Sequence, residues 1–183
     1  MRTVHGSNLK QRGKGRKVMY ERFGEFTSAD EINETAVNLR KEGDKESIKI
    51  LATENGIDED VVEAFLEGDL FYLCDAMSAA IGKIDVEAAA MKAKEIMADW
   101  ADYIKARCFE DEDMARAVRG KDKSLKGCIG ELLKWSFKNQ IPIDKEIMKA
   151  AGVSAGRCTL GIPGMGTAKQ IITDYYMGKK VAK

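Results

Sequence analysis

Only two prolines, Pro142 and Pro163, occur in this chain of 183 residues. Proline removes a backbone N–H and clashes with the preceding helical turn, so its scarcity leaves long stretches free to form helices. Apolar residues recur mostly three and four positions apart, the spacing that places them on one face of a helix. The sequence therefore predicts an all-α, compact multi-helix protein with little or no sheet.

Start and stop signals predict three short helices in the first part of the chain. Ser28 with Glu31 predicts a capping box that opens the first helix, and Asp44 and Asp58 are expected to cap the second and third. A glycine follows each of the three apolar patterns, as is typical of helix ends.

The second part of the chain carries longer apolar patterns. A helix from about Val86 to Cys108 is expected to pack centrally, and a helix near residues 124–138 should turn Leu133 and its apolar neighbours toward the core. Pro142 should break this pattern, with a short helix after Asp144, irregular chain over 152–166 and a last helix.

Charge divides the chain, although its formal net charge is zero. Residues 1–17 hold six basic and no acidic residues, and residues 18–75 hold 16 acidic and five basic ones. Residues 76–113 hold nine acidic and five basic residues, and residues 114–183 hold five acidic and 14 basic ones. We therefore expect a flexible basic tail (1–17), an acidic N-terminal helical lobe (18–82), and a second helical lobe (83–183) with a central long helix and a basic C-terminal part.

Segregated charge steers association with partners and says little about fold. Each patch could instead be an ordinary solvated face, because charged helical surfaces are common. The two patches could also face one another, within the monomer or across a dimer.

The stretch 47–69 has the rhythm of a helix-turn-helix, but its second helix is studded with carboxylates that duplex DNA would repel. The simpler interpretation is an antiparallel helix pair. The sharper hypothesis is that the carboxylates imitate nucleic-acid phosphate and occupy a basic groove on a partner protein. The predicted acidic contact residues are Asp58, Glu59, Asp60, Glu63, Glu67, Asp69, Glu110, Asp111, Glu112 and Asp113.

A basic cluster follows the acidic stretch and suits contact with a partner protein or with RNA or single-stranded DNA. We expect the neighbouring Trp135 to be a core residue. The predicted basic contact residues are Arg116, Arg119, Lys121, Lys123, Lys126, Lys134 and Lys138.

Residues for catalysis or metal binding are scarce. His5 is the only histidine, and the four cysteines lack the close pairs of a zinc or dithiol site, so we expect buried thiols. The glycine-rich stretch 161–166 precedes Thr167 without the Lys-Ser/Thr order of a nucleotide-binding loop, and Thr167 with Gln170 predicts a capping box instead. We expect no enzyme, cofactor or metal.

Neither export nor a membrane span is indicated. The basic N-terminus lacks the apolar run of a secretory signal, and no stretch approaches the roughly 18 apolar residues of a membrane helix. We therefore expect the protein in the cytoplasm, with no membrane contact.

Four stretches covering most of residues 24–179 resemble a family of small proteins from mobile elements of Gram-positive gut bacteria. They read GEFTSADEINETAVNLRKEGDKESI, IMADWADYIKARC, KSLKGCIGELLKWSFKN and AGRCTLGIPGMGTAKQIITDYYMGK. That family includes an anti-CRISPR inhibitor of type II-A RNA-guided DNA nucleases. The resemblance implies a phage or mobile-element inhibitor that binds the nuclease with its guide RNA in the bacterial cytoplasm and prevents target cleavage.

The resemblance carries no catalytic motif, so it assigns no functional residue. The region 124–176 also resembles, more faintly, small accessory proteins of conjugative plasmids. The alternative function is therefore a nucleic-acid-binding accessory or regulatory protein of a conjugative element, which would use the basic residues.

Overall fold

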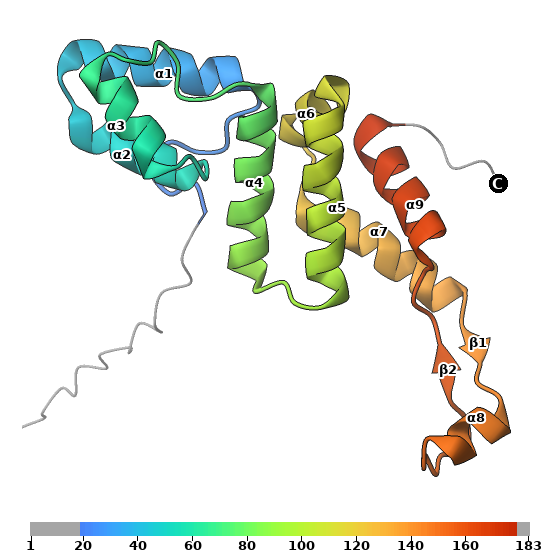
Figure 1. Ribbon diagram of the computed structural model, residues 1–183. Coiled ribbons are helices and arrows are strands. Elements are labelled where there is room, and N and C mark those ends of the chain that lie inside the picture. Colours follow the sequence, from blue (N-terminus) through green and yellow to red (C-terminus); the bar gives the residue numbers. More distant parts are fainter. Residues whose placement is uncertain (1–18, 179–183) are drawn as a thin grey trace, which may run out of the picture.

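The computed structural model describes residues 19–178, and within them the chain forms nine helices and one pair of two-residue strands (Figure 1). The predicted all-α class with a minimum of sheet is confirmed. The predicted basic tail, with His5, lies outside the described residues. The elements are α1 (Ala29–Glu42), α2 (Lys45–Glu54), α3 (Glu59–Glu67), α4 (Ala76–Met91), α5 (Ile96–Glu110), α6 (Glu112–Arg119), α7 (Leu125–Lys138), β1 (Ile141–Pro142), α8 (Lys145–Ala150), β2 (Thr159–Leu160) and α9 (Met165–Met177).

The first three helices begin and end where the capping residues predict. The Ser28 hydroxyl accepts a hydrogen bond from the backbone N–H of Glu31 at the start of α1, and the Asp44 carboxylate accepts one from that of Ser47 at the start of α2. Asp58 occupies the N-cap of α3 without a side-chain hydrogen bond. The capping box at α1 differs from the prediction in one respect, because the Glu31 carboxylate accepts from the Thr27 N–H.

The N-terminal lobe, which we define as α1–α3 with the loop 68–75, has its own apolar core. Ile32 and Ala36 of α1, Ile48 and Leu51 of α2, and Phe65 of α3 are all inaccessible to solvent within it. The three helices are too short to be stable alone, so burial of these side chains is what holds them.

The long helix predicted from Val86 to Cys108 is wrong, because the chain breaks there into α4 and α5. Lys92 and Glu95 adopt left-handed backbone conformations, with φ of 53° and 51°. These residues end α4 and precede α5, so that α5 turns back and packs beside α4 (Figure 1).

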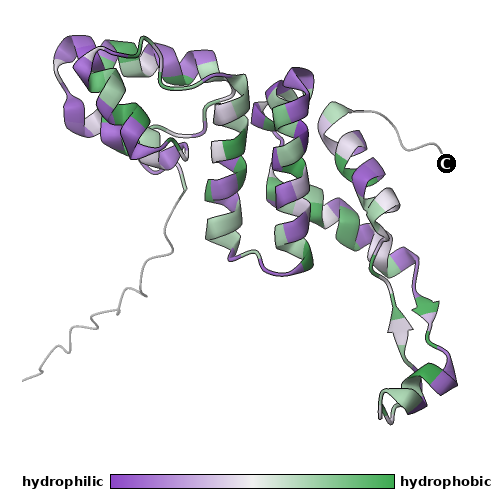
Figure 2. Cartoon of the chain, viewed as in Figure 1, coloured by the Kyte–Doolittle hydropathy of each residue, from purple (hydrophilic) through white to green (hydrophobic). Residues whose placement is uncertain are grey.

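The C-terminal lobe, α4–α9, encloses the larger core. Helix α4 packs against α5 and α6, and α7 packs against α9 and α4. At its centre four helices bury Ile84, Trp100, Ile104, Leu132 and Ile172. Figure 2 shows hydrophobic segments alternating with hydrophilic ones along each of these helices, as amphipathic packing requires.

Helix α4 belongs to both cores, because Ala79 is buried in the first and Ala80 in the second. The expected boundary between residues 82 and 83 therefore falls inside a helix rather than in a linker. Gly82 of α4 and Gly56, which follows α2, meet backbone to backbone, with no room for a Cβ atom on either. Gly56 also has a φ of 66°, which favours glycine.

Buried polar side chains of α4 contact the segment before α1 and the start of α7. The Lys83 ammonium, which is inaccessible to solvent, lies 2.6 Å from a Glu25 carboxylate oxygen and donates a 2.7 Å hydrogen bond to the Lys123 carbonyl. Glu87 is also buried and accepts a 2.5 Å hydrogen bond from the Leu125 N–H. A buried charge is costly unless it is paired or hydrogen-bonded. Because Lys83 and Glu87 of α4 find these partners at the start of α7, the contacts hold the start of α7 against α4.

A short arm of β1, α8 and β2 extends from the end of α7 (Figure 1). The two strands pair antiparallel, with Ile141 opposite Leu160. No residue of α8 is buried. Helix α9 then begins at Met165 after Gly164, so the capping box predicted at Thr167 is wrong: that residue lies within the first turn.

Candidate functional site

Helix α3 presents the strongest unneutralised charge among the described residues. Val62 and Phe65 turn inward to the core, which leaves the polar positions facing solvent. Six carboxylates on this surface are exposed, and none forms an ion pair with another residue of 19–178. We call them the α3 acidic face: Asp58, Glu59, Asp60, Glu63, Glu67 and Asp69. No lysine or arginine occurs between positions 58 and 75. The nearest cation is Arg40 of α1, which lies 4.1 Å from the Phe65 ring on the inner side of α3 and offsets part of the negative field.

The second predicted acidic stretch has a largely structural role. The Asp111 carboxylate caps α6 by accepting from the Met114 N–H, and it also lies 3.0 Å from an Arg107 guanidinium nitrogen. Glu110 pairs with Arg107 at 3.3 Å, and Glu112 pairs with Arg116 at 2.6 Å. Only Asp113 of this stretch has no ion pair within the described part of the chain. This stretch lies at the α5–α6 junction of the C-terminal lobe. It is therefore separate from the α3 acidic face, and the two predicted acidic groups do not form one surface.

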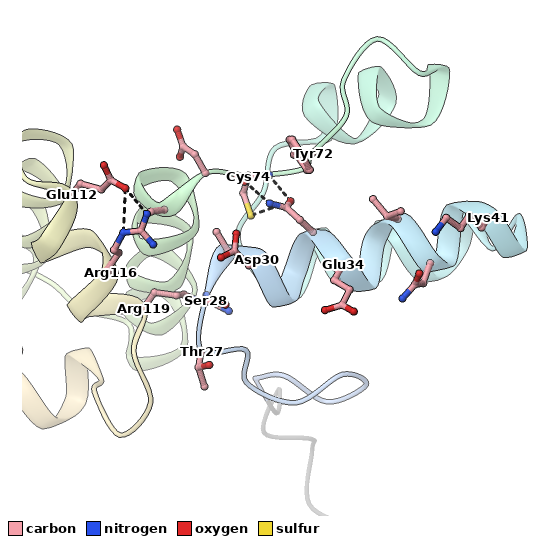
Figure 3. Close-up of a pocket in the computed structure, with 16 residues that line it drawn as sticks. Thr27, Ser28, Asp30, Glu34, Lys41, Tyr72, Cys74, Glu112, Arg116 and Arg119 are labelled. Carbon is pink, nitrogen blue, oxygen red and sulfur yellow. Dashed lines mark hydrogen bonds and ion pairs between the residues drawn. The ribbon is translucent and has the colours of Figure 1, made fainter.

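A groove of about 830 Å³ runs between α1 and α6 (Figure 3). Glu112 and Arg116 line one side of it, and α1 lines the other. Three carboxylates that the sequence analysis did not single out join Glu112 there: Asp30, Glu34 and Asp75. Asp30 and Glu34 are four positions apart, so the sequence spacing could have shown that they share one face of α1. The groove therefore adds acidic surface next to the N-terminal lobe.

Two groups that line this groove, Asp75 and Cys74, have pKa values shifted from their usual values. Hydrogen bonds from the Ser78 hydroxyl and backbone N–H hold the pKa of Asp75 below its usual value, so this helix cap stays charged. Burial raises the pKa of the Cys74 thiol to about 12. The thiol is therefore protonated at neutral pH and is a poor nucleophile.

Four of the predicted basic contact residues lie at the surface: Lys121, Lys126, Lys134 and Lys138 are exposed. Lys134 pairs with Glu131 at 2.6 Å, whereas the other three form no ion pair with a described residue. Arg116 is also exposed but is neutralised by Glu112. The basic surface is thus real but sparser than the sequence predicts.

Arg119 is not a surface residue, contrary to the prediction. It is 1% exposed, and its guanidinium donates hydrogen bonds to the Asn55 side chain and to the Ala79 carbonyl oxygen, at 2.5 and 3.3 Å. Helix α6 turns Arg119 inward together with Ala115 and Val118. It joins the lobes and is unavailable to a partner.

Lys123 is also withdrawn from the predicted basic surface. Its ammonium donates a 2.5 Å hydrogen bond to the Tyr175 carbonyl oxygen and lies 4.8 Å from the centre of the Tyr175 ring. These contacts attach the start of α7 to α9. Lys123 therefore serves the fold, because its charge is already engaged by a carbonyl and an aromatic face.

Exposed apolar side chains form a feature that the sequence analysis missed. Leu133, predicted to be in the core, is 53% exposed, and Phe137 one turn later is 74% exposed. Trp135, also predicted to be in the core, is only half-buried. In the other lobe, Phe71 and Tyr72 are 74% and 67% exposed.

The remaining chemistry of the described residues is limited. Three of the four cysteines are buried as predicted, and Cys158 is half-buried. Residues 19–178 contain no group of three or more histidine, cysteine, aspartate or glutamate side chains arranged to hold a metal ion. None of the helices in that range is long and apolar enough to cross a membrane.

In comparisons with models of known protein families, with curated proteins and with solved structures, the chain matched none. Functional inference therefore depends on the residues and surfaces of the chain itself.

Proposed function

We propose that this protein is an anti-CRISPR inhibitor that binds a type II-A RNA-guided DNA nuclease with its guide RNA and prevents cleavage of the target DNA. The observation that carries the proposal is the α3 acidic face, with six exposed carboxylates that have no ion-pair partner in residues 19–178. The resemblance of four sequence stretches to a family containing such an inhibitor supports the same proposal. The role requires no catalytic residue, and it places the protein in the bacterial cytoplasm.

The charge density of the α3 acidic face resembles that of a nucleic-acid strand. The four carboxylates within α3 extend from Glu59 to Glu67, which at a helical rise of 1.5 Å per residue is about 12 Å, or roughly one charge per 3–4 Å. One strand of B-DNA carries one phosphate per about 3.4 Å of helix axis. A guided nuclease holds nucleic acid in a positively charged channel and reads its short adjacent motif with arginines. The α3 acidic face is therefore suited to occupy part of such a channel.

The primary test is guided cleavage of a DNA target by purified type II-A nucleases with increasing amounts of the protein. Glu63→Lys with Glu67→Lys reverses two charges outside the first turn of α3, so neither change opposes the helix dipole. If each reversal costs about 1 kcal/mol of binding, half-inhibition should require about thirtyfold more protein.

The matched control reverses two exposed acids outside α3, one before α1 and one at the end of α1: Glu21→Lys with Glu42→Lys. Neither carboxylate has an ion-pair partner among the described residues, and the net charge changes equally. The control should inhibit like the wild type. Equal potency of all three proteins would refute the role of the α3 acidic face while leaving inhibition itself established.

A second candidate function is favoured by the exposed lysines. Lys121, Lys126 and Lys138 have no carboxylate partner among residues 19–178, as expected of groups that contact phosphate. The protein would then be a nucleic-acid-binding accessory or regulatory protein of a conjugative element. Binding to bare DNA at two salt concentrations separates the two functions. Salt-sensitive DNA binding with unchanged cleavage by several nucleases would support the accessory protein, and inhibition without DNA binding would support the inhibitor.

A further inference from the structure

The arm carries a basic pocket that the sequence analysis did not single out. A hollow of about 710 Å³ lies between α8 and the loop 152–158, and we call it the arm pocket. Its charged lining residues are Lys145, Lys149 and Arg157, and no carboxylate lines it. Figure 1 shows the arm projecting away from both lobes, with α8 at its end. The described helices of the lobes therefore leave the arm pocket accessible to a partner.

The end of α8 brings the loop 152–158 back beside the helix. The Val153 N–H donates to the Met148 carbonyl oxygen at 2.9 Å, and Gly152 has a φ of 65°, which favours glycine. The Ile143 N–H donates to the Cys158 carbonyl oxygen at 2.9 Å and closes the arm at the other end of the loop. The loop and α8 thus face each other across the pocket.

The three cations of the arm pocket are available to an external anion. All three are exposed, and none forms an ion pair with another residue of 19–178. Lys145 and Lys149 are four positions apart, so they lie on one face of α8, separated by about 6 Å along its axis. Arg157 lines the pocket from the loop.

Backbone donors accompany these cations. None of the N–H groups of residues 154–157 donates a hydrogen bond to another described residue. Successive backbone N–H groups of this kind form a concave site for anions. Ser154 adds a hydroxyl to the pocket lining. Lysine, arginine and serine side chains, together with backbone N–H groups, are the donors that contact phosphate in nucleic-acid complexes.

Two carboxylates near the arm pocket limit its positive field. Asp144 caps α8 by accepting a 2.8 Å hydrogen bond from the Glu146 N–H, and Glu146 is exposed on the same helix. Neither residue lines the pocket, and no acidic residue occurs over 147–173. Residues 141–160 thus hold three basic and two acidic residues. Binding of an anion should therefore be moderate in strength and sensitive to salt.

We propose that the arm pocket binds the sugar-phosphate backbone of a single nucleic-acid strand. Its volume lies in the range of pockets for small ligands, which leaves room for a nucleotide. The 6 Å between the two lysines along α8 corresponds to about two nucleotides at 3.4 Å per phosphate, so Lys145 and Lys149 contact neighbouring phosphates. A single strand bends into the pocket, whereas duplex DNA is stiff over about 50 nm. The site is independent of both proposed functions, because neither uses its residues.

The test is fluorescence anisotropy of a labelled single-stranded RNA of about 20 nucleotides, titrated with the full chain at 50 and 200 mM salt. Lys145→Gln with Lys149→Gln removes two phosphate contacts. With about 0.7 counterions released per contact, this change should weaken binding about 60-fold at 50 mM salt and about tenfold at 200 mM. The slope of log K against log salt concentration should therefore become shallower by about 1.4.

The matched control is Lys45→Gln with Lys49→Gln. This exposed pair on α2 has the same spacing, and neither lysine has an ion-pair partner among the described residues. The control should bind RNA like the wild type. Equal affinity of all three proteins would overturn the proposal, and so would equal weakening in both variants, because the loss would then follow net charge alone.

Three comparisons distinguish other occupants and other sites. Lys126→Gln with Lys138→Gln alters exposed lysines of α7, and a loss confined to this variant would overturn the proposal in favour of that surface. Poly-glutamate should displace the RNA less effectively than unlabelled RNA of equal charge, and equal displacement would assign the pocket to an acidic protein instead. Duplex DNA that binds as tightly as the single strand, or a wild type that does not bind RNA at 50 mM salt, would also overturn the proposal.

Discussion

Two glycine-to-alanine changes in helices should shift stability in opposite directions. Alanine is favoured over glycine in a helix interior by about 1 kcal/mol. At Gly130 of α7 a Cβ atom would meet nothing within 4 Å, so Gly130→Ala should stabilise by about that amount. At Gly82 of α4 the Cβ would overlap the Asn55 carbonyl oxygen and approach that of Gly56 to 2.9 Å. Both neighbours are backbone and cannot rotate away, so overpacking of about 3 kcal/mol should exceed the propensity gain and leave Gly82→Ala destabilised by about 2 kcal/mol.

Thermal unfolding followed by circular dichroism at 222 nm measures both changes. For a domain of this size 1 kcal/mol corresponds to about 2–4 °C in Tm, so Gly130→Ala should melt about 2–4 °C higher and Gly82→Ala about 4–8 °C lower than the wild type. An increase in stability on Gly82→Ala would refute the close backbone contact between α2 and α4. A loss in both variants would instead refute the use of helix propensity at Gly130.

Three further outcomes are expected. Asn33→Ala should lower the free energy of unfolding by about 3 kcal/mol relative to the exposed control Asn38→Ala, because three buried backbone groups of the loop 68–75 lose their hydrogen bonds; urea unfolding measures this difference. Burial raises the pKa of Glu87 despite its backbone hydrogen bond, so the folded state binds the proton more tightly than the unfolded state and loses stability as pH rises above about 4.5. The free energy of unfolding of Glu87→Gln should therefore rise relative to that of the wild type between pH 4 and pH 7. A difference between the two proteins that is the same at both pH values would contradict the raised pKa. In the native protein a thiol reagent should modify Cys158 first, since the other three thiols are buried with pKa values of about 12; mass spectrometry locates the label.

Helix ends that depend on local chemistry could be predicted from the sequence, and one that depends on packing could not. Ser28 and Asp44 cap their helices through contacts within three residues, so sequence spacing sufficed. The break between α4 and α5 has no glycine or proline. There Lys92 and Glu95 adopt positive φ, at a cost of about 1–3 kcal/mol each, and packing of α5 on α4 offsets that cost. A single sequence does not show that compensation.

The acidic and basic residues were predicted as charges, but the sequence did not reveal which of them serve the fold. Arg119 follows Ala115 by four positions and therefore lies on the apolar face of α6. Its burial could have been inferred from this spacing. Lys123 gave no such signal, because its carbonyl and aromatic partners lie 52 residues away in the sequence. The exposure of Phe71 and Phe137 was equally hidden, since apolar periodicity alone does not tell a covered face from an uncovered one.

The buried contacts between the lobes bear directly on the α3 acidic face. Asn55 ends α2, accepts the Arg119 hydrogen bond and lies three residues before the N-cap of α3. Gly56, the next residue, rests on α4. The chain that leads into α3 is therefore fixed to the C-terminal lobe at two adjacent positions. A carboxylate surface held in this way loses little conformational entropy on binding, whereas the same charges on a mobile segment would lose more. Loosening this contact should thus weaken binding of a basic partner even though every carboxylate of α3 remains in place.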